Sequence, residues 1–329
     1  MAVQITIIGL GQIGASFGLA LAGQVEKLER VGHDLNPEVA KKALQLGAVD
    51  RISINLPSAV RNADIVLLAL PLDQIRETLE IIAEDLKENA VVLDTAPVKT
   101  IVSAWVKELL PSNRYYIGLT PVLNPVYLLM PESGVDAARA DLFQHSVMCI
   151  TTPPGITSEV IKLASDLTHI VGAVNLFVDP LENDSIMAAT HILPQLISAA
   201  LLNATVDQPG WIEARKVAGR AYAQMTNPSA QLGEPKTISS SSVFDRENVL
   251  RVVDDVIAAL QAMRDDIERS DIPALEARLE RARQGRRLWW SQRQSANWEE
   301  PIATAHISTG AEVFGRLIGI RSKKRTNPK

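Results

Sequence analysis

The pattern of hydrophobic and polar positions changes about halfway along the chain. The first half alternates short, nearly continuous apolar runs with segments of helical periodicity. The apolar runs predict strands at 3–9, 30–34, 63–69, 90–94, 115–119 and 146–151, and the periodic segments predict helices at 14–23, 37–46, 73–86 and 98–109. This alternation is typical of a mostly parallel sheet that is covered by helices on both faces.

After about residue 179 the strand pattern stops and helical periodicity takes over. Helices are expected at 181–203, 211–225, 246–270 and 272–292, and the serine- and proline-containing stretch 227–245 predicts a loop. We therefore expect an N-terminal α/β domain over 1–175, an all-helical domain over 176–292 and a C-terminal tail over 293–329. The boundary between the two domains is expected near residues 170 to 180.

Length, net charge and cysteine content exclude several classes of protein. The chain has 329 residues, of which 47 % are hydrophobic and 22 % charged, so it is long enough for two globular domains. A net charge of −5 provides no overall basic field for nucleic acid or for an anionic membrane. The lone Cys149 excludes an intramolecular disulfide framework and is compatible with the cytoplasm.

Two stretches of the sequence, 2–25 and 321–325, have compositions that raise the question of a membrane or phosphate contact. The uncharged stretch 2–25 is interrupted by glycines and glutamines, so a strand, a turn and a buried helix explain it better than a membrane span. The basic run 321–325 is typical of a solvated terminus, with a phosphate contact as the alternative. No partner of the nucleic-acid or membrane class is expected.

A glycine motif follows the first predicted strand and begins the first predicted helix. It reads Gly9-Leu10-Gly11-Gln12-Ile13-Gly14. In this context Gly9 permits a tight turn, Gly11 leaves space for a pyrophosphate, and Gly14 lets helix and strand pack closely. The helix N-terminus, with Gln12 and Ile13 in its first turn, offers free N–H groups to phosphates. The N-terminal domain is therefore predicted to be of the Rossmann dinucleotide-binding type.

The second strand ends in an acid that bears on the choice of cofactor. Asp34 lies 20 residues after Gly14, where a carboxylate accepts hydrogen bonds from the adenosine ribose. This favours NAD, while Lys41 and Lys42 keep NADP open. The alternative is that Asp34 caps the helix that follows. His33 is expected to pack or to face solvent.

Leu70 and Pro71 end the third long strand at the edge of the sheet where ligands bind. They are therefore expected to contact the cofactor. The alternative is a turn that simply requires proline, and the two roles are compatible.

At this point the sequence resembles the prephenate and arogenate dehydrogenases of tyrosine biosynthesis. The resemblance covers residues 3 to 290 in order and spacing, and 132–143 is its most specific stretch. It rests further on the glycine motif, on 63–71, on Asp94-Thr95-Ala96-Pro97-Val98-Lys99, on 151–153, and on 183–184 with 190–196. It implies NAD(P)-dependent oxidative decarboxylation of a cyclohexadienyl acid, with a histidine base and cations for two substrate carboxylates.

Four departures from the family pattern fall on its site residues. The family's Gly-Gly-His-Pro reads Gly118-Leu119-Thr120-Pro121, so Thr120 stands at the position of the base. Pro97 replaces a serine, Asn227 aligns with an arginine, and Gln195 replaces the histidine of Leu-Pro-His. Because a threonine hydroxyl is a poor base at neutral pH, prephenate turnover is expected to be weak or absent.

Other residues are candidates for the missing groups. His191 is one helical turn from Gln195 and is the substitute base, unless it is a half-buried helix histidine that is bonded locally. Arg215 and Arg220 are candidate substrate cations, with surface positions or ion pairs as the alternative. Lys99 keeps the family pattern and is expected to face the nicotinamide, unless it is a surface residue at a helix start.

The sequence lacks the motifs of two other enzyme classes. It contains no Gly-x-Ser-x-Gly and no His-Glu-x-x-His, so a serine hydrolase and a zinc protease are disfavoured and no metal is expected. Two alternatives to the leading function remain, namely an NAD-binding family member that has lost this chemistry and a dehydrogenase for another substrate. An apolar stripe on the predicted helix 246–270 favours a homodimer through the helical domain, with an intramolecular core as the alternative: Leu250, Val253, Ile257, Leu260 and Ile267.

Overall fold

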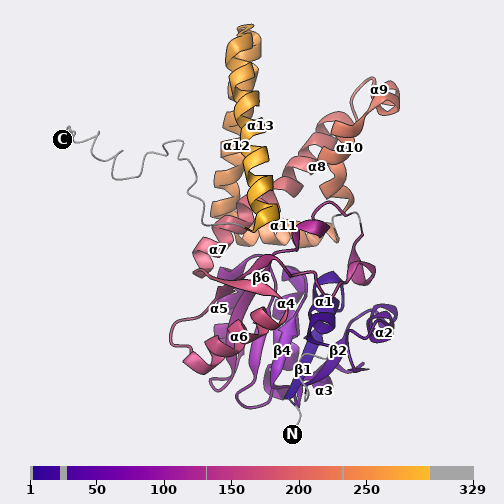
Figure 1. The fold of residues 1–329 in the computed structure, drawn as a ribbon, viewed down its shortest axis with the longest axis vertical. Coiled ribbons are helices and arrows are strands. Elements are labelled where there is room, and N and C mark those ends of the chain that lie inside the picture. The colour runs from indigo at the N-terminus through magenta and orange to yellow at the C-terminus, as the bar shows by residue number, and fades with distance from the viewer. Residues whose placement is uncertain (1–2, 23–27, 131, 232, 297–329) are drawn as a thin grey trace, which may run out of the picture. The chain divides into compact units, whose positions relative to one another are not determined.

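A computed structural model describes residues 3–22, 28–130, 132–231 and 233–296 (Figure 1). Within them, eight strands form one sheet in the order β3-β2-β1-β4-β5-β6-β7-β8. The strands are β1 (Val3–Ile8), β2 (Leu28–His33), β3 (Arg51–Ile52), β4 (Ile65–Leu68), β5 (Val91–Asp94), β6 (Tyr115–Pro121), β7 (Ser146–Thr151) and β8 (Ala173–Phe177). All neighbours pair in parallel except β6 and β7, so the predicted mostly parallel sheet is confirmed.

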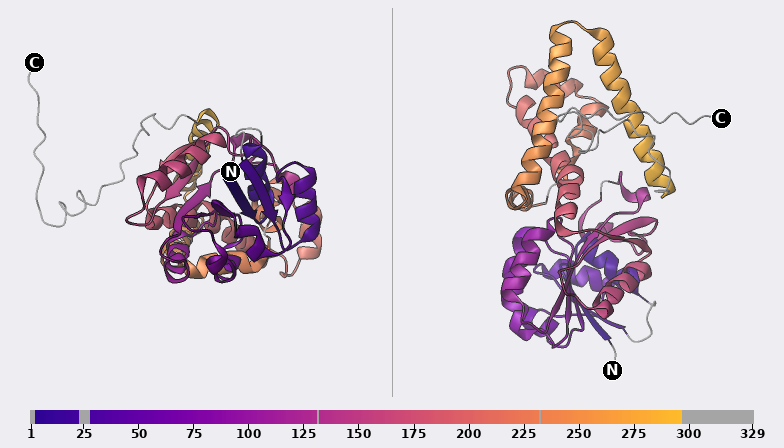
Figure 2. Two further views of the ribbon diagram at one scale, coloured as in Figure 1. Left: turned by 90° about the horizontal axis from the view of Figure 1, so that it is seen from below. Right: turned by 90° about the vertical axis from the view of Figure 1, so that its left-hand side faces the viewer.

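Helices cover both faces of this sheet (Figure 2). They are α1 (Gln12–Leu21), α2 (Pro37–Gln45), α3 (Leu56–Val60), α4 (Leu72–Ile82), α5 (Lys99–Leu109) and α6 (Ser158–Ile170). Successive strand residues serve opposite faces: Ile65 and Leu67 pack with α1, α2 and α6, whereas Val66 and Leu68 pack with α3, α4 and α5. Burial on both sides explains why the strands are continuously apolar in the sequence.

The order of the strands places a ligand-binding edge at β1. The chain passes from β1 outward to β2 and β3, then returns to the other side of β1 with β4 and continues to β5. The loops that follow β1 and β4 therefore diverge at their carboxyl ends. Such a switch point is where ligands bind in open α/β sheets.

The part of the chain after β8 is helical, as predicted. Its elements are α7 (Pro180–Met187), a π-helical segment η4 (Ala188–Ile192), α8 (Leu193–Thr205), α9 (Trp211–Val217), α10 (Arg220–Ala230), α11 (Pro235–Phe244), α12 (Arg246–Glu268) and α13 (Ile272–Ser295). The π-helical turn occurs just before Pro194, which has no N–H to offer the carbonyl four residues earlier.

Two predictions for the helical part are wrong. The stretch 227–245 is not a loop, because α10 continues through Pro228 to Ala230 and α11 occupies 235–244. Two of its serines, Ser241 and Ser242, fit into α11 because their hydroxyls donate to carbonyls four residues earlier. The helix expected over 211–225 is broken at Ala218 and Gly219.

The first unit of the chain extends beyond the sheet. The described residues up to Gln284 form one compact unit and those from Gly285 belong to a second, so the sheet and most of the helices share the first unit. The domain boundary near 170 to 180 stays a prediction. Helix α13 runs to Ser295, past the residue at which the tail was expected to begin, and the basic run 321–325 lies outside the described residues.

One helical stretch of the described chain is long and apolar enough to cross a membrane by length and composition. It spans Pro180–Thr205, with a mean hydropathy of 1.5 and 17 % of its window buried. The same composition fits a helix whose apolar face is covered by protein. On α12 four residues of the predicted stripe, Leu250, Ile257, Leu260 and Ile267, are also exposed in the single chain.

Candidate functional site

The glycine loop between β1 and α1 has the close contacts that its sequence predicts. Gly9 has a φ of 87°, and a Cβ there would lie 2.4 Å from the Ala69 carbonyl oxygen. A Cβ on Gly14 would lie 1.9 Å from the Gly9 carbonyl oxygen. Both positions therefore require glycine if the loop is to keep this shape.

Gly11 differs from the other two glycines because open space surrounds it. A Cβ at Gly11 would meet no atom within 4 Å. Gly11 is the N-cap of α1, and its first turn carries neither a side-chain cap nor an acidic residue. The amides of Gln12 and Ile13 thus begin a helix whose N-terminus fits a phosphate group. The Gln12 side chain itself donates to the Ala137 carbonyl at 3.4 Å.

A cavity of about 310 Å³ opens beside this loop. It is lined by the glycines and by the ends of β1, β2 and β4, including Gly9, Gly11, Asp34, Leu70 and Pro71. The structure thereby brings together five residues that the sequence predicts for cofactor binding. His33 also lines the cavity and is buried, and its Nδ1 lies 2.8 Å from the Ser53 carbonyl oxygen.

Asp34 is held at the rim of the cavity by two backbone amides. Its Oδ2 accepts from the Leu10 amide and its Oδ1 from the Asn36 amide, both at 2.8 Å. The alternative that Asp34 caps the next helix is wrong, because Asn36 is the N-cap and accepts from the Glu38 amide. Lys42 forms an ion pair with Asp136. The ribose role of Asp34 stays a prediction with a suitable geometry.

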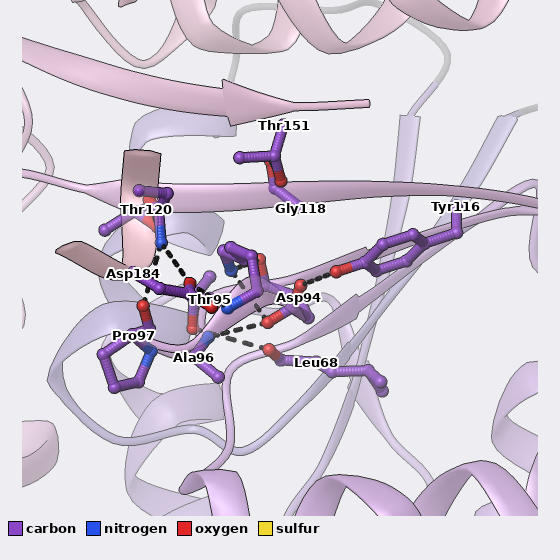
Figure 3. A network of polar contacts seen from close by, with 12 residues as sticks. Leu68, Asp94, Thr95, Ala96, Pro97, Tyr116, Gly118, Thr120, Thr151 and Asp184 are labelled. Carbon is purple, nitrogen blue, oxygen red and sulfur yellow. Dashed lines mark hydrogen bonds and ion pairs between the residues drawn. The ribbon is translucent and has the colours of Figure 1, made fainter. Parts of the chain in front are cut away.

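A network of buried polar groups follows β5 (Figure 3). The Lys99 ammonium is fully buried and donates to Asp94 Oδ1 at 2.8 Å and to the Asp94 carbonyl at 3.2 Å. Asp94 Oδ2 accepts from the Tyr116 hydroxyl at 2.6 Å. The alternative of Lys99 as a surface residue is therefore wrong. Its ammonium is bound to two oxygens of Asp94, and a contact with the cofactor stays a prediction.

Burial shifts the pKa values of two groups in this network, Lys99 and Tyr116. Burial lowers the pKa of the Lys99 ammonium, although the Asp94 carboxylate opposes that shift. Burial and the same carboxylate raise the pKa of Tyr116 well above its ordinary value, so the phenol remains a donor. Gly118 leaves the necessary space, since a Cβ there would lie 2.8 Å from Lys99 Cδ.

Helix α7 is joined to the start of α5 by the Asp184 carboxylate. Asp184 Oδ1 accepts from the Lys99 amide at 2.6 Å, and Oδ2 accepts from the Thr100 amide at 2.9 Å. Asp184 thus caps a helix that begins 85 residues earlier in the chain. The adjacent Asn183 donates from Nδ2 to the Pro97 carbonyl at 2.9 Å.

Thr120 on β6 is hydrogen-bonded to α7 at this same junction. Its hydroxyl is buried and donates to Asn183 Oδ1 at 2.9 Å. Because the amide oxygen of Asn183 can only accept, the hydroxyl proton of Thr120 is already in use. Thr120 can therefore orient a neighbouring group, but its placement does not provide a base.

His191 lies on the exposed side of the π-helical segment η4. The neighbours Ala188 and Ile192 are buried in the core beside α4 and α5, which fixes the segment in place. Gln195 Nε2 donates to the His191 carbonyl at 2.8 Å and lies 3.4 Å from His191 Nε2. The two side chains thus share one helix face as predicted. The residue is exposed, yet the surrounding protein lowers the pKa of its imidazole by burial, so both the base and the locally bonded alternative stay predictions.

The two candidate substrate cations lie apart from the residues above. Arg215 on α9 and Arg220 at the start of α10 are both exposed. Helix α9 lies at the end of the helical region that is far from the sheet in Figure 1. Their surface position agrees with the alternative that the sequence left open, and their role toward substrate stays a prediction.

Sequence reasoning missed three residues of the buried network. Tyr116 on β6 had the pattern of an ordinary strand residue, and Gly118, two residues later, was noted only as part of the family motif and not for the space it leaves beside Lys99. Asp184 was noted as part of the family motif, but its contact with α5 had no local signal. In the described residues, no group of three or more His, Cys, Asp or Glu side chains is placed to hold a metal ion.

Comparison with known proteins gives a consistent picture. A family model described as the prephenate dehydrogenase nucleotide-binding domain matches residues 17–176, and one described as the prephenate dehydrogenase dimerization domain matches residues 179–281. The chain is 23 % identical to a prephenate dehydrogenase of Bacillus subtilis over 81 % of its own length and 71 % of that protein. It is 25 % identical to a cyclohexadienyl dehydrogenase of Zymomonas mobilis over 81 % and 89 %.

Solved structures share the fold. Prephenate dehydrogenase from A. aeolicus, in complex with hydroxyphenyl propionate and NAD+, superposes with a TM-score of 0.76 at 22 % identity. The alignment covers 87 % of this chain and 98 % of that one. Arogenate dehydrogenase from Synechocystis gives a TM-score of 0.68 at 23 % identity, over 87 % and 100 % of the two chains.

Proposed function

We propose that this chain, which belongs to the prephenate dehydrogenase family, oxidises and decarboxylates a cyclohexadienyl acid with NAD. The observation that carries the proposal is the intact cofactor site, in which the glycine loop, the free N-terminus of α1 and Asp34 surround one cavity. Bound NAD accepts the hydride from the ring carbon that bears the substrate hydroxyl. NAD is favoured over NADP because the charged residues that line the cavity, Asp34 and Glu77, are acidic.

His191 is the base in this proposal. It is an exposed imidazole on a helix face shared with Gln195, and a neutral imidazole can take the hydroxyl proton. Gln195 orients the ring from the next turn. Thr120, at the position of the family's histidine, does not serve as the base because a neutral hydroxyl is a poor proton acceptor, and its donation to Asn183 gives it a structural contact instead. We expect turnover to be slow, because His191 does not stand at the position of the family's base and a well-placed base contributes about 10²–10⁴-fold.

A second candidate function is favoured by the same Thr120 contact. A chain that binds NAD but has lost the dehydrogenation chemistry would keep the cofactor cavity. It would not need a base at position 120, where the buried Thr120 hydroxyl is hydrogen-bonded to Asn183. A dehydrogenase for a different acid is the third possibility. Arg215 and Arg220 remain the proposed cations for substrate carboxylates.

Formation of NADH with prephenate and with arogenate separates these functions. The proposal expects turnover with at least one of the two acids, and a drop of at least about tenfold in His191→Asn. NAD binding without turnover on either acid would favour the second or third possibility. Exposed Gln208 provides the control, because Gln208→Asn should leave turnover unchanged.

The assembly proposed is a homodimer through the helical domain, working in the cytoplasm on a small molecule. The match to a dimerization domain over 179–281 supports the location of the interface. The exposed apolar residues of α12 and of the stretch Pro180–Thr205 support a covered face. The lone Cys149, which is buried, is compatible with a reducing compartment.

A further inference from the structure

One wall of the cofactor cavity is formed by polar side chains of a single helix. Gln74, Glu77 and Thr78 of α4 all line the cavity. Their spacing of three and four residues places them on one helix face. In the described part of the chain, no hydrogen bond or ion pair to protein is found for the exposed Glu77 carboxylate or for the side-chain amide of Gln74. The side-chain hydroxyl of the buried Thr78 has none either.

The charged neighbours of Glu77 on the same helix are paired elsewhere. Arg76 donates to Glu80 at 3.0 Å and to both oxygens of Glu108 on α5, at 2.7 and 3.0 Å. Arg76 is therefore occupied away from the cavity and does not neutralise Glu77. The carboxylate of Glu77 is a charged acceptor that faces a cavity and lacks a donor.

Another part of the lining is apolar and suits a flat ring. Leu35, Leu56 and Ile81 line the cavity, and Leu35 and Ile81 are 81 % and 46 % exposed. Large aliphatic side chains left this exposed at a cavity are suited to cover the faces of an aromatic base. His33 also lines the cavity, and its Nδ1 donates to the Ser53 carbonyl at 2.8 Å.

We propose that Glu77 recognises the purine of the dinucleotide by accepting a hydrogen bond from the exocyclic amine of adenine. The inference rests on the proposed function, because it requires NAD in this cavity. Adenine carries a donor at its six position, whereas hypoxanthine carries a carbonyl oxygen there. A carboxylate attracts the first and repels the second, so Glu77 selects adenine over a six-oxo purine.

The experiment compares NAD with nicotinamide hypoxanthine dinucleotide. Their dissociation constants are measured by titration calorimetry on the full-length wild type and on Glu77→Gln and Glu84→Gln. The wild type is expected to bind NAD at least about tenfold more tightly than the hypoxanthine dinucleotide. In Glu77→Gln the ratio should fall below about threefold, because a carboxamide can turn its amine toward the six-oxo group.

Glu84→Gln is the matched control. Glu84 is an exposed acid just beyond α4 that does not line the cavity, so its change should leave the ratio at the wild-type value. A ratio of about tenfold that persists in Glu77→Gln would overturn the inference, as would a wild type that binds both dinucleotides equally. Absence of NAD binding to the wild type would overturn the proposed function as well, which distinguishes the two failures.

Discussion

Gly11→Val tests whether the glycine loop is a pyrophosphate site. The structure predicts that the valine side chain fits the free protein, since no atom lies within 4 Å of its Cβ position and the Gly11 backbone is extended. The branched side chain would instead occupy the space in front of the α1 N-terminus. A clash together with the loss of a charged hydrogen bond should weaken NAD binding by more than about 2 kcal/mol, which is about 30-fold in Kd.

Calorimetric titration with NAD measures this loss, and thermal unfolding shows whether the variant is folded. The melting temperature of Gly11→Val should stay within about 3 °C of the wild type. Gly14→Ala is the contrasting variant, because its Cβ would meet the Gly9 carbonyl oxygen at 1.9 Å and should destabilise the fold by about 1–3 kcal/mol. A folded Gly11→Val protein with wild-type NAD affinity would refute the Rossmann assignment of this loop.

Four further predictions concern the cofactor, the base, the dimer and the buried lysine. Asp34→Asn keeps an acceptor for the Leu10 amide but removes the charge, so the ratio of NADP to NAD affinity should rise at least about tenfold in binding titrations. Burial lowers the pKa of His191 below its ordinary value, so His191→Asn should lower kcat at least about tenfold and remove from rate profiles a pH dependence that lies below the ordinary histidine range. Leu260→Lys should shift light-scattering mass from dimer toward monomer. Lys99→Met should lower the free energy of unfolding in urea by about 3–5 kcal/mol, because it leaves the Asp94 carboxylate buried without its cation.

Matched control variants distinguish these specific effects from a general loss of folding or stability. Ile54→Lys alters an apolar side chain that is 90 % exposed outside the helical part, and should leave the dimer intact. Lys162→Met removes an exposed pair with Asp166, and should cost no more than about 1 kcal/mol. Equal losses in Lys99→Met and Lys162→Met would contradict the buried-pair argument. Preference for NADP in the wild type would contradict the ribose role of Asp34.

The α/β part of the fold was predictable because its strands are apolar on both faces. Runs such as 65–68 carry that pattern in the sequence itself, and the glycine loop fixes where the first helix begins. The short β3 and the exposed β8 lacked such a pattern and were not predicted. Helix α11 was taken for a loop because serine disfavours helices in isolation, whereas here its hydroxyls bond within the helix.

The cofactor half of the site was predictable and the other half was not. Gly9, Gly11, Asp34, Leu70 and Pro71 lie within short, ordered motifs, so their convergence on one cavity follows from the fold. The partners of Lys99 and Thr120 depend on contacts across the chain. Asp184 and Asn183 reach them from α7, and no local pattern in the sequence indicates which carboxylate or amide will meet them.

The Asp184 cap limits where an anionic ligand can bind at this edge of the sheet. Three helices begin there after β1, β4 and β5, and each brings the partial positive charge of its N-terminus. At α5 that charge is neutralised by Asp184, and at α4 the first turn carries its own acid, Asp73. Among these three, α1 alone keeps an uncapped N-terminus without an acid in its first turn. An anionic dinucleotide therefore has one helix end on which to place its phosphates, which fixes the direction in which it lies. Among the ends of these three helices a substrate carboxylate finds no second free one, so the proposed substrate depends on side-chain cations.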